Sequence, residues 1–255
     1  MHKDIGLALI TFDRPNYLRQ SLSNLEKYNW GGATTKYVIV DEIYDSFKYS
    51  WLNDSKNFKV IYQKNSGVGK AKNLGLKKLI SENCKHLFLI EDDILITSEN
   101  TCTDYVSYAQ ITNVPHLNFA LHGELNKGRK RIVEWQKKRG MILPICVYPD
   151  CVGAFSYYSD RIIKEIGFLD ENFINAWEHV EHTFRISMSG EIPPFWFFMD
   201  HPDSENLLSE IPGSLLNSKI RSDPDWTRKM EDGIQYWIRK HGFFCLRGLK
   251  RQIRV

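Results

Sequence analysis

Short, nearly continuous hydrophobic runs alternate along the first hundred residues with segments in which apolar residues recur every three or four positions. The continuous runs are typical of strands covered on both faces, and the recurring positions are typical of amphipathic helices. Strands are therefore predicted at 5–12, 36–40, 58–63 and 86–90. The intervening helices have apolar faces formed by Leu18, Leu22, Leu25 and Tyr28, and by Ala71, Leu74, Leu79 and Ile80. This alternation predicts an α/β fold with a mostly parallel central sheet flanked by helices.

The second half of the chain is less regular. A basic segment, 127–139, is predicted to be an exposed loop or helix. A strand is expected at 151–157, followed by a helix from 159 to 166 that ends at Gly167. A further helix is predicted at 177–189 because its apolar residues have helical spacing.

The composition is that of an ordinary globular protein. With 255 residues, 42% hydrophobic and 25% charged, the chain fits one large domain with a small extension and excludes a disordered or fibrous protein. No apolar run is long enough to span a bilayer and no secretory signal is recognised, so a cytoplasmic protein is expected. The five cysteines contain no Cys-x-x-Cys pair, which indicates reduced, mostly buried thiols rather than a disulfide framework or zinc ribbon.

Positive charge is concentrated at the C-terminus. Although the net charge is only +3, the residues after Asp232 include six lysines and arginines and no acid. Apolar side chains are interleaved with them, so the tail is expected either to rest on an anionic membrane face or to pack as a helix against the domain. The composition as a whole is not that of a nucleic-acid-binding protein.

Three consecutive acids, Glu91, Asp92 and Asp93, follow the predicted buried strand 86–90. Adjacent carboxylates at such a place repel one another and are partly desolvated, so a compensating cation is expected. Mg²⁺ or Mn²⁺ suits oxygen ligands and keeps positions open for phosphate oxygens. The alternative is a helix N-cap cluster or a solvated acidic turn.

Polar residues also follow the other predicted strands, at the sheet edge where ligands of α/β proteins bind. Asp13 can cap a helix that begins near Pro15, and Asp41 ends the second strand. The turn 65–70 presents backbone amides and nearby lysines that can receive an anion at the start of a helix. That turn lacks the full phosphate-loop pattern, so a simple helix-opening turn is an equal alternative.

A third cluster lies in the predicted helix 177–189. Glu178, Glu181 and His182 fall on one helix face at separations of three and four residues and could include a general base. The alternative is a polar helix face with local ion pairs. His201 is a lone histidine, which without further context is most often a turn or surface residue.

Taken together, these segments resemble a nucleotide-sugar-dependent, inverting glycosyltransferase of the GT-A fold, similar to family 2. The likeness covers about residues 4–205 and follows the order of the family's motifs. Residues 10–15 resemble the first-strand motif, 65–75 resemble the asparagine–glycine turn with Lys72 in place of the usual arginine, and 91–93 resemble the Asp-x-Asp metal motif.

The resemblance implies roles for particular residues. Asp93 and His201 would ligate the metal, and a base would come from Glu178 or His179. The nucleotide-sugar would contact Thr11, Phe12, Arg14, Asp41, Gly67, Lys70, Asn73, Glu91 and Asp92. One departure affects the base, because the family commonly has Trp-Glu-Asp-x-Asp where this chain has Trp-Glu-His-Val-Glu. The role falls to Glu178, His179 or Glu181, with Glu178 and His179 preferred.

The resemblance therefore implies a metal-dependent sugar transfer. The donor would be a UDP-linked sugar, and the acceptor would be a hydroxyl group of a glycan or of a lipid-linked molecule. The catalytic domain is expected at 1–205, with the nucleotide part at about 1–95 and the acceptor part at about 96–205, and a basic helical extension at 206–255. A nucleotidyltransferase on a related fold would use the same acids and metal but release pyrophosphate. A module that binds nucleotide or carbohydrate without catalysis is the non-enzymatic alternative.

Overall fold

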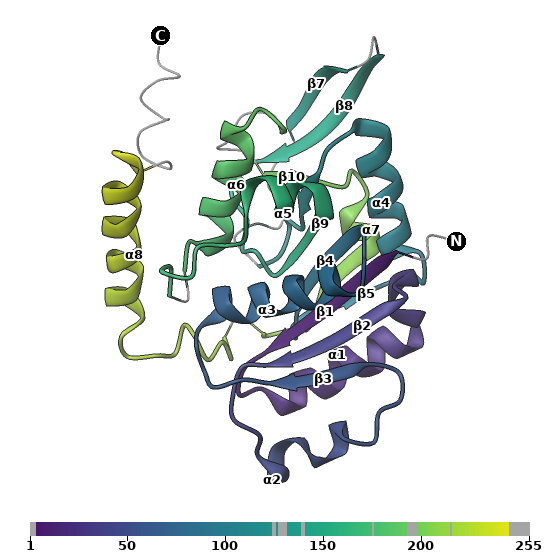
Figure 1. The fold of residues 1–255 in the computed structure, drawn as a ribbon, viewed down its shortest axis with the longest axis vertical. Helices are drawn as coiled ribbons and strands as arrows, with labels where there is room; N and C mark the ends of the chain where they lie inside the picture. The colour runs from purple at the N-terminus through teal and green to yellow at the C-terminus, as the bar shows by residue number, and fades with distance from the viewer. Residues whose placement is uncertain are drawn as a thin grey trace.

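A six-stranded sheet forms the centre of the protein in a computed structural model that describes residues 4–123, 126, 132–138, 141–174, 176–192, 198–214 and 216–244 (Figure 1). Its strand order is β3-β2-β1-β4-β9-β6. The strands are β1 (Ile5–Thr11), β2 (Thr35–Val40), β3 (Lys59–Tyr62), β4 (His86–Glu91), β9 (Phe155–Ser159) and β6 (His116–Asn118). The first four are parallel, and β9 runs antiparallel to both of its neighbours. The predicted α/β fold and its mostly parallel sheet are confirmed.

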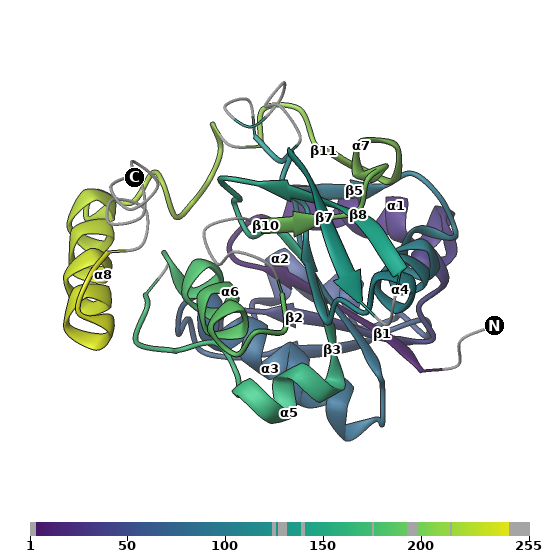
Figure 2. The ribbon, with the colours of Figure 1, turned by 90° about the horizontal axis from the view of Figure 1, so that it is seen from above.

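Helices cover both faces of this sheet. In Figure 2, α3 and α5 lie on one side of the sheet and α1 lies on the other. The helices are α1 (Pro15–Lys27), α2 (Ser46–Tyr49), α3 (Val68–Ser81), α4 (Thr101–Thr112), α5 (Asp160–Ile166), α6 (Glu178–Met188), α7 (Ser204–Leu207) and α8 (Trp226–His241), with 3₁₀ turns at Asn29–Gly32 and Ser50–Leu52. Every residue of β1 is buried, as its continuous apolar run requires. A Cβ at Gly75 would lie 2.8 Å from that of Ala8, so this glycine lets α3 approach β1 closely.

Two smaller sheets extend the central one. One has the order β10-β8-β7 and consists of β10 (Phe198–Asp200), β8 (Met141–Tyr148) and β7 (Ile132–Lys138). The other pairs β5 (Ile94–Ile96) with β11 (Leu208–Glu210). The prediction of a loop or helix at 127–139 is wrong for 132–138, because that segment pairs along its length with β8. Backbone pairing with a strand that follows in the chain outweighed the basic composition.

Helix ends follow the sequence signals in one case and depart from them in another. Ser159 caps α5 by accepting a hydrogen bond from the Ile162 amide, and Gly167 ends the helix with a φ of 87°, as predicted. Asp13 does not cap α1, so that expectation is wrong. Its backbone has a φ of 49°, and its carboxylate pairs with Lys48 and Lys219 instead.

The extension packs against the domain through α8. Trp237 is fully buried beside Phe173 and Phe184, and a Cβ at Gly233 would lie 2.6 Å from the Trp177 ring. The packed-helix alternative is therefore confirmed for 226–241, while the rest of the basic tail, 245–255, lies outside the described residues. Within the described part of the chain, no helix combines the length and the apolar character needed to cross a bilayer. The four described cysteines are free, and three of them are buried.

Asp170 is the polar anchor of α8. Its carboxylate accepts hydrogen bonds from Lys240 at 2.6 Å and from the Tyr236 hydroxyl at 2.9 Å. Burial by itself raises the pKa of Asp170, but the bonds from Lys240, the Asn172 amide and Tyr236 outweigh it and lower the pKa to about 2. Ionised Asp170 therefore stabilises the docked helix.

We expect Asp170→Asn to reduce the free energy of unfolding at pH 7 by about 1–2 kcal/mol. The folded pKa lies below the ordinary value of 3.8, so this stabilisation is complete above that value and disappears as the pH falls through about 2. Denaturant unfolding at pH 7 and at pH 2.5 (roughly between the two pKa values) should show the gap between wild type and variant shrinking in acid. Asp232→Asn, at an exposed site on the same helix, is the control. Equal losses at both pH values would contradict the assignment.

Candidate functional site

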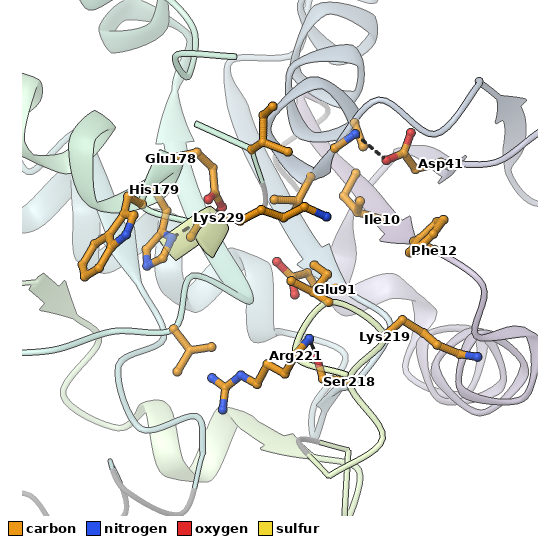
Figure 3. A pocket seen from close by; sticks show the side chains of 18 of the residues that line it. Ile10, Phe12, Asp41, Glu91, Glu178, His179, Ser218, Lys219, Arg221 and Lys229 are labelled. Carbon is orange, nitrogen blue, oxygen red and sulfur yellow. Dashed lines mark hydrogen bonds and ion pairs between the residues drawn. The ribbon is translucent and has the colours of Figure 1, made fainter. Parts of the chain in front are cut away.

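A cavity of about 860 Å³ opens at the carboxyl ends of β1, β2 and β4 (Figure 3). Its walls come from these strand ends, from the turn before α3, from the start of α6 and from residues 218–230 of the extension. The edge of the sheet where the sequence predicted ligand binding therefore carries the cavity.

The acidic turn forms one wall of the cavity. Asp92 and Asp93 are both buried, and the same Arg14 nitrogen lies 3.1 Å from Asp92 and 3.2 Å from Asp93. The Thr11 hydroxyl also donates a hydrogen bond to Asp92. Arg14 is therefore the protein's own compensating cation, and the turn is neither a helix cap nor freely solvated.

Arg14 leaves part of this negative charge uncompensated. Oδ1 of Asp93 is buried and has no hydrogen-bond partner in the described part of the chain. Burial raises the pKa of Asp92 to about 8 in spite of the opposing attraction of Arg14. Among the described residues, no three His, Cys, Asp or Glu side chains converge on one point. The turn thus fits a hard cation only if a bound ligand supplies further oxygens.

Lys72 joins the acidic turn to α6. This buried lysine lies 2.8 Å from Glu91 and 3.1 Å from Glu178, and it donates to the Gly153 carbonyl at 3.0 Å. Burial opposes its charge, but the two carboxylates outweigh burial and raise the pKa of Lys72. It therefore remains an ammonium that uses all three donors on these partners. Its position in a helical motif gave no indication of this bridging role.

The first residues of α6 face the cavity from the opposite side. Trp177 has a left-handed backbone with a φ of 72°, rare for a bulky residue, and Glu178 and His179 follow it into the cavity wall. Burial raises the pKa of Glu178, but Lys72 and His179 outweigh it, so the pKa lies well below its ordinary value. Glu178 is therefore an ionised but weak base.

The His179 ring is held on several sides. Nε2 lies 3.1 Å from the Cys151 carbonyl, and Nδ1 lies 3.4 Å from a Glu178 carboxylate oxygen. Nδ1 is buried and forms no hydrogen bond with the described residues. A Cβ at Gly153 would lie 2.4 Å from the ring, so only glycine allows this packing. Because a carbonyl can only accept, Nε2 carries a proton in this arrangement.

Asp41 binds the turn before α3 rather than leaving its amides open. Its carboxylate accepts hydrogen bonds from the Ser66 and Gly67 amides at 3.1 and 3.2 Å and from Gln63 at 2.7 Å. Burial raises the pKa of Asp41, in opposition to these bonds. The turn that was expected to receive an anion thus already has a carboxylate on two of its amides. It still forms part of the cavity wall, through Asn65, Ser66 and Gly67.

Most of the predicted site residues meet in the cavity. Those that line it are Thr11, Phe12, Arg14, Asp41, Gly67, Glu91, Asp92, Asp93, Glu178 and His179. Lys70, Asn73 and His201 do not line it. Lys70 is exposed on α3, while Asn73 is buried and bonded to both backbone groups of Leu169. Val68 and Ala71 of the same helix do line the cavity, so Lys70 and Asn73 lie on other faces of α3.

The remaining candidates have other partners. The His201 ring packs against Tyr105 and Tyr108 of α4, and its Nδ1 accepts a hydrogen bond from the Asp203 amide. Glu181 is buried outside the cavity, where it pairs with Arg185 and Lys240. It therefore ties α6 to α8.

The sequence did not predict that the extension would reach the site. Ser218, Lys219 and Arg221 line the cavity, and Figure 3 shows them beside Glu91. Lys219 lies 3.0 Å from Asp13, and Asn217 donates to the Tyr17 hydroxyl at 3.0 Å. These contacts join positions about two hundred residues apart, and the segment has no periodicity or motif that could have revealed them.

Comparisons with known proteins agree with this architecture. No family model matches the chain. It is 25% identical over 234 residues, 87% of each chain, to an uncharacterized glycosyltransferase, R363, of Acanthamoeba polyphaga mimivirus. Residues 1–349 of S. aureus TarS in complex with UDP superpose with a TM-score of 0.53 at 15% identity, covering 99% of this chain and 75% of that one.

A second solved structure is the mannosyltransferase PcManGT from Pyrobaculum calidifontis in complex with GDP-Man and Mn²⁺. It superposes with a TM-score of 0.52 at 11% identity and 74% coverage of this chain, which spans about half (53%) of the mannosyltransferase. At such identities the solved structures establish the fold. The chain has the GT-A fold, as the resemblance implied.

Proposed function

We propose that this GT-A chain transfers a sugar from a nucleotide-sugar donor to an acceptor hydroxyl group. The observation that carries the proposal is that Asp92 and Asp93 line the same cavity as Glu178 and His179, at the ends of the parallel strands. An uncompensated carboxylate oxygen on one side and a histidine–carboxylate pair on the other provide separate places for a diphosphate and an acceptor. The mimivirus relative is named a glycosyltransferase, which supports the same activity.

The donor is proposed to be UDP-linked and held with Mn²⁺ or Mg²⁺. Asp93 would hold the cation through its unpaired oxygen, and the diphosphate would complete the oxygen ligands. When bound, the cation offsets negative charge on the departing diphosphate. Arg221 and Lys219 add positive charge from the extension. That His201 ligates the cation stays a prediction. In this structure its ring packs against the α4 tyrosines.

The chemical step is proposed to invert the anomeric carbon. The acceptor oxygen forms a bond to that carbon while the bond to the diphosphate oxygen breaks, and the leaving group keeps the electron pair. A base at the start of α6, His179 or Glu178, takes the hydroxyl proton. Lys72 holds Glu178 ionised for this purpose. A glycan or lipid-linked acceptor stays a prediction from the resemblance, and the cytoplasm or a membrane face as the place of reaction stays a prediction from the sequence.

The proposal is tested by calorimetric titration with UDP, UDP-sugars and GDP-sugars, with and without Mn²⁺. We expect one class of nucleotide-sugar to bind at a single site and Mn²⁺ to strengthen the binding. Product analysis should then detect free nucleoside diphosphate. Release of pyrophosphate would identify a nucleotidyltransferase instead, and binding without turnover to acceptor or water would indicate a binding module.

A further inference from the structure

A second histidine lines the cavity, and the proposed reaction gives it no role. His122 is only 1% exposed and shares the cavity with Asp92 and Asp93. It follows β6, which runs parallel to β4 because both strands are antiparallel to β9. The chain after β6 therefore emerges at the same edge of the sheet as the acidic turn.

Glu210 lies beside the His122 ring. Nδ1 lies 2.8 Å from a Glu210 carboxylate oxygen, and the Gly123 amide donates to the same oxygen at 3.0 Å. Asn126 holds the backbone by donating to the His122 carbonyl at 2.9 Å. Neither ring nitrogen forms a hydrogen bond with the residues that the structure describes: Nδ1 is buried, and its contact with Glu210 is one of distance only. A buried histidine whose nitrogens make no hydrogen bond to the protein keeps that capacity for a ligand in the cavity it lines.

The His122–Glu210 pair sits beside the acidic turn. Glu210 is opposite Ile94 in the pairing of β11 with β5, and the Ile211 amide donates to the Asp93 carbonyl at 2.8 Å. The strand that carries Glu210 is thus attached to the residue proposed to hold the cation. His179, by contrast, enters the cavity from α6. The two histidines therefore serve different ends of the cavity.

We propose that His122 donates a hydrogen bond from Nε2 to the terminal phosphate of the donor's diphosphate. This inference rests on the proposed function and deepens it. As the bond between the sugar and the diphosphate breaks, the phosphate oxygen gains negative charge, and the N–H···O bond from His122 offsets it without transferring a proton. Glu210 lies beside the other ring nitrogen, Nδ1, at 2.8 Å.

The test compares UDP with UMP, which lacks the second phosphate, by calorimetry on the full chain in EDTA and in Mn²⁺. His122→Gln and Glu210→Gln are expected to weaken UDP binding by roughly 10–100-fold in both conditions, as for loss of a hydrogen bond to a charged group. UMP binding should stay within about twofold of wild type, since an untouched site changes little. His86→Gln is the matched control, because His86 lies at the opposite end of β4 and outside the cavity.

Each other outcome has a distinct meaning. If the variants bind UDP like wild type, the inference fails while the proposed function stands. A loss confined to Mn²⁺ would make His122 a metal ligand, and equal losses for UDP and UMP would make it part of the nucleoside site; both overturn the proposal. If wild type binds no nucleotide, the proposed function fails and takes this inference with it. His122→Asn provides a second readout if Glu210→Gln lowers the melting temperature.

Discussion

Asp93→Asn is expected to reduce metal-dependent sugar transfer by roughly 10²–10³-fold, comparable to the loss of one group that stabilises charge in a transition state. The substitution keeps the shape of the side chain but removes the charge of the buried, unpaired oxygen in the acidic turn. Arg14 retains its contact with Asp92 at 3.1 Å, so the wall should keep its structure. The measurement is the initial rate of nucleoside diphosphate release across a range of Mn²⁺ concentrations.

The accompanying binding data separate the cation from the nucleotide. UDP affinity in EDTA should change little in Asp93→Asn, whereas the gain in affinity that Mn²⁺ gives wild type should disappear. Asp54→Asn, an exposed carboxylate outside the cavity, should behave as wild type in both assays. Unchanged transfer with an unchanged dependence on Mn²⁺ would falsify the assignment of Asp93.

The sequence predicted the donor half of the fold well because its information is local. The continuous apolar runs of β1 and β4 end in polar residues, and parallel strands bring such ends to one edge. The adjacent acids at 91–93 repel one another at the end of a buried strand, so the sequence alone predicted a compensating cation. These are properties of short segments, so no knowledge of distant contacts was needed to locate the cavity.

The rest of the site depends on contacts between distant segments. Lys72 occupies an ordinary helical position, and only tertiary packing brings it within 3.1 Å of Glu178, 106 residues away. Arg14 compensates acids that lie 79 residues further along the chain. Residues 218–221 reach the cavity because α8 docks against α6, and that docking depends on the burial of Trp237. Periodicity and motifs carry no information about such pairings.

The α6 pair should separate catalysis from donor binding. We expect His179→Ala to lower kcat by roughly 10²–10⁴-fold, the usual contribution of general-base help, while nucleotide affinity stays nearly unchanged. Glu178→Gln should lower kcat as well, but it should also reduce the melting temperature. It removes one of the two carboxylates that compensate buried Lys72, and a buried charge that loses a partner is costly. Glu181→Gln is the contrasting control, since Glu181 ties α6 to α8 outside the cavity and should affect stability more than kcat.

The pH dependence of kcat distinguishes the two members of the pair. Lys72 keeps the pKa of Glu178 well below its ordinary value, so a reaction that used this carboxylate as its base would keep its rate as the pH fell through 5 (about the upper edge of the carboxylate range). An imidazole base instead loses its free lone pair on protonation, so a rate that depends on it falls in acid while the Glu178 carboxylate is still ionised. We expect the second profile in wild type. A rate that stayed level in acid would move the base to Glu178 and leave His179 as a residue that positions it. The lowered Glu178 pKa thus excludes Glu178 as the source of an acid limb, and a limb that disappears in His179→Ala belongs to the histidine rather than to Asp92, whose pKa burial raises to about 8.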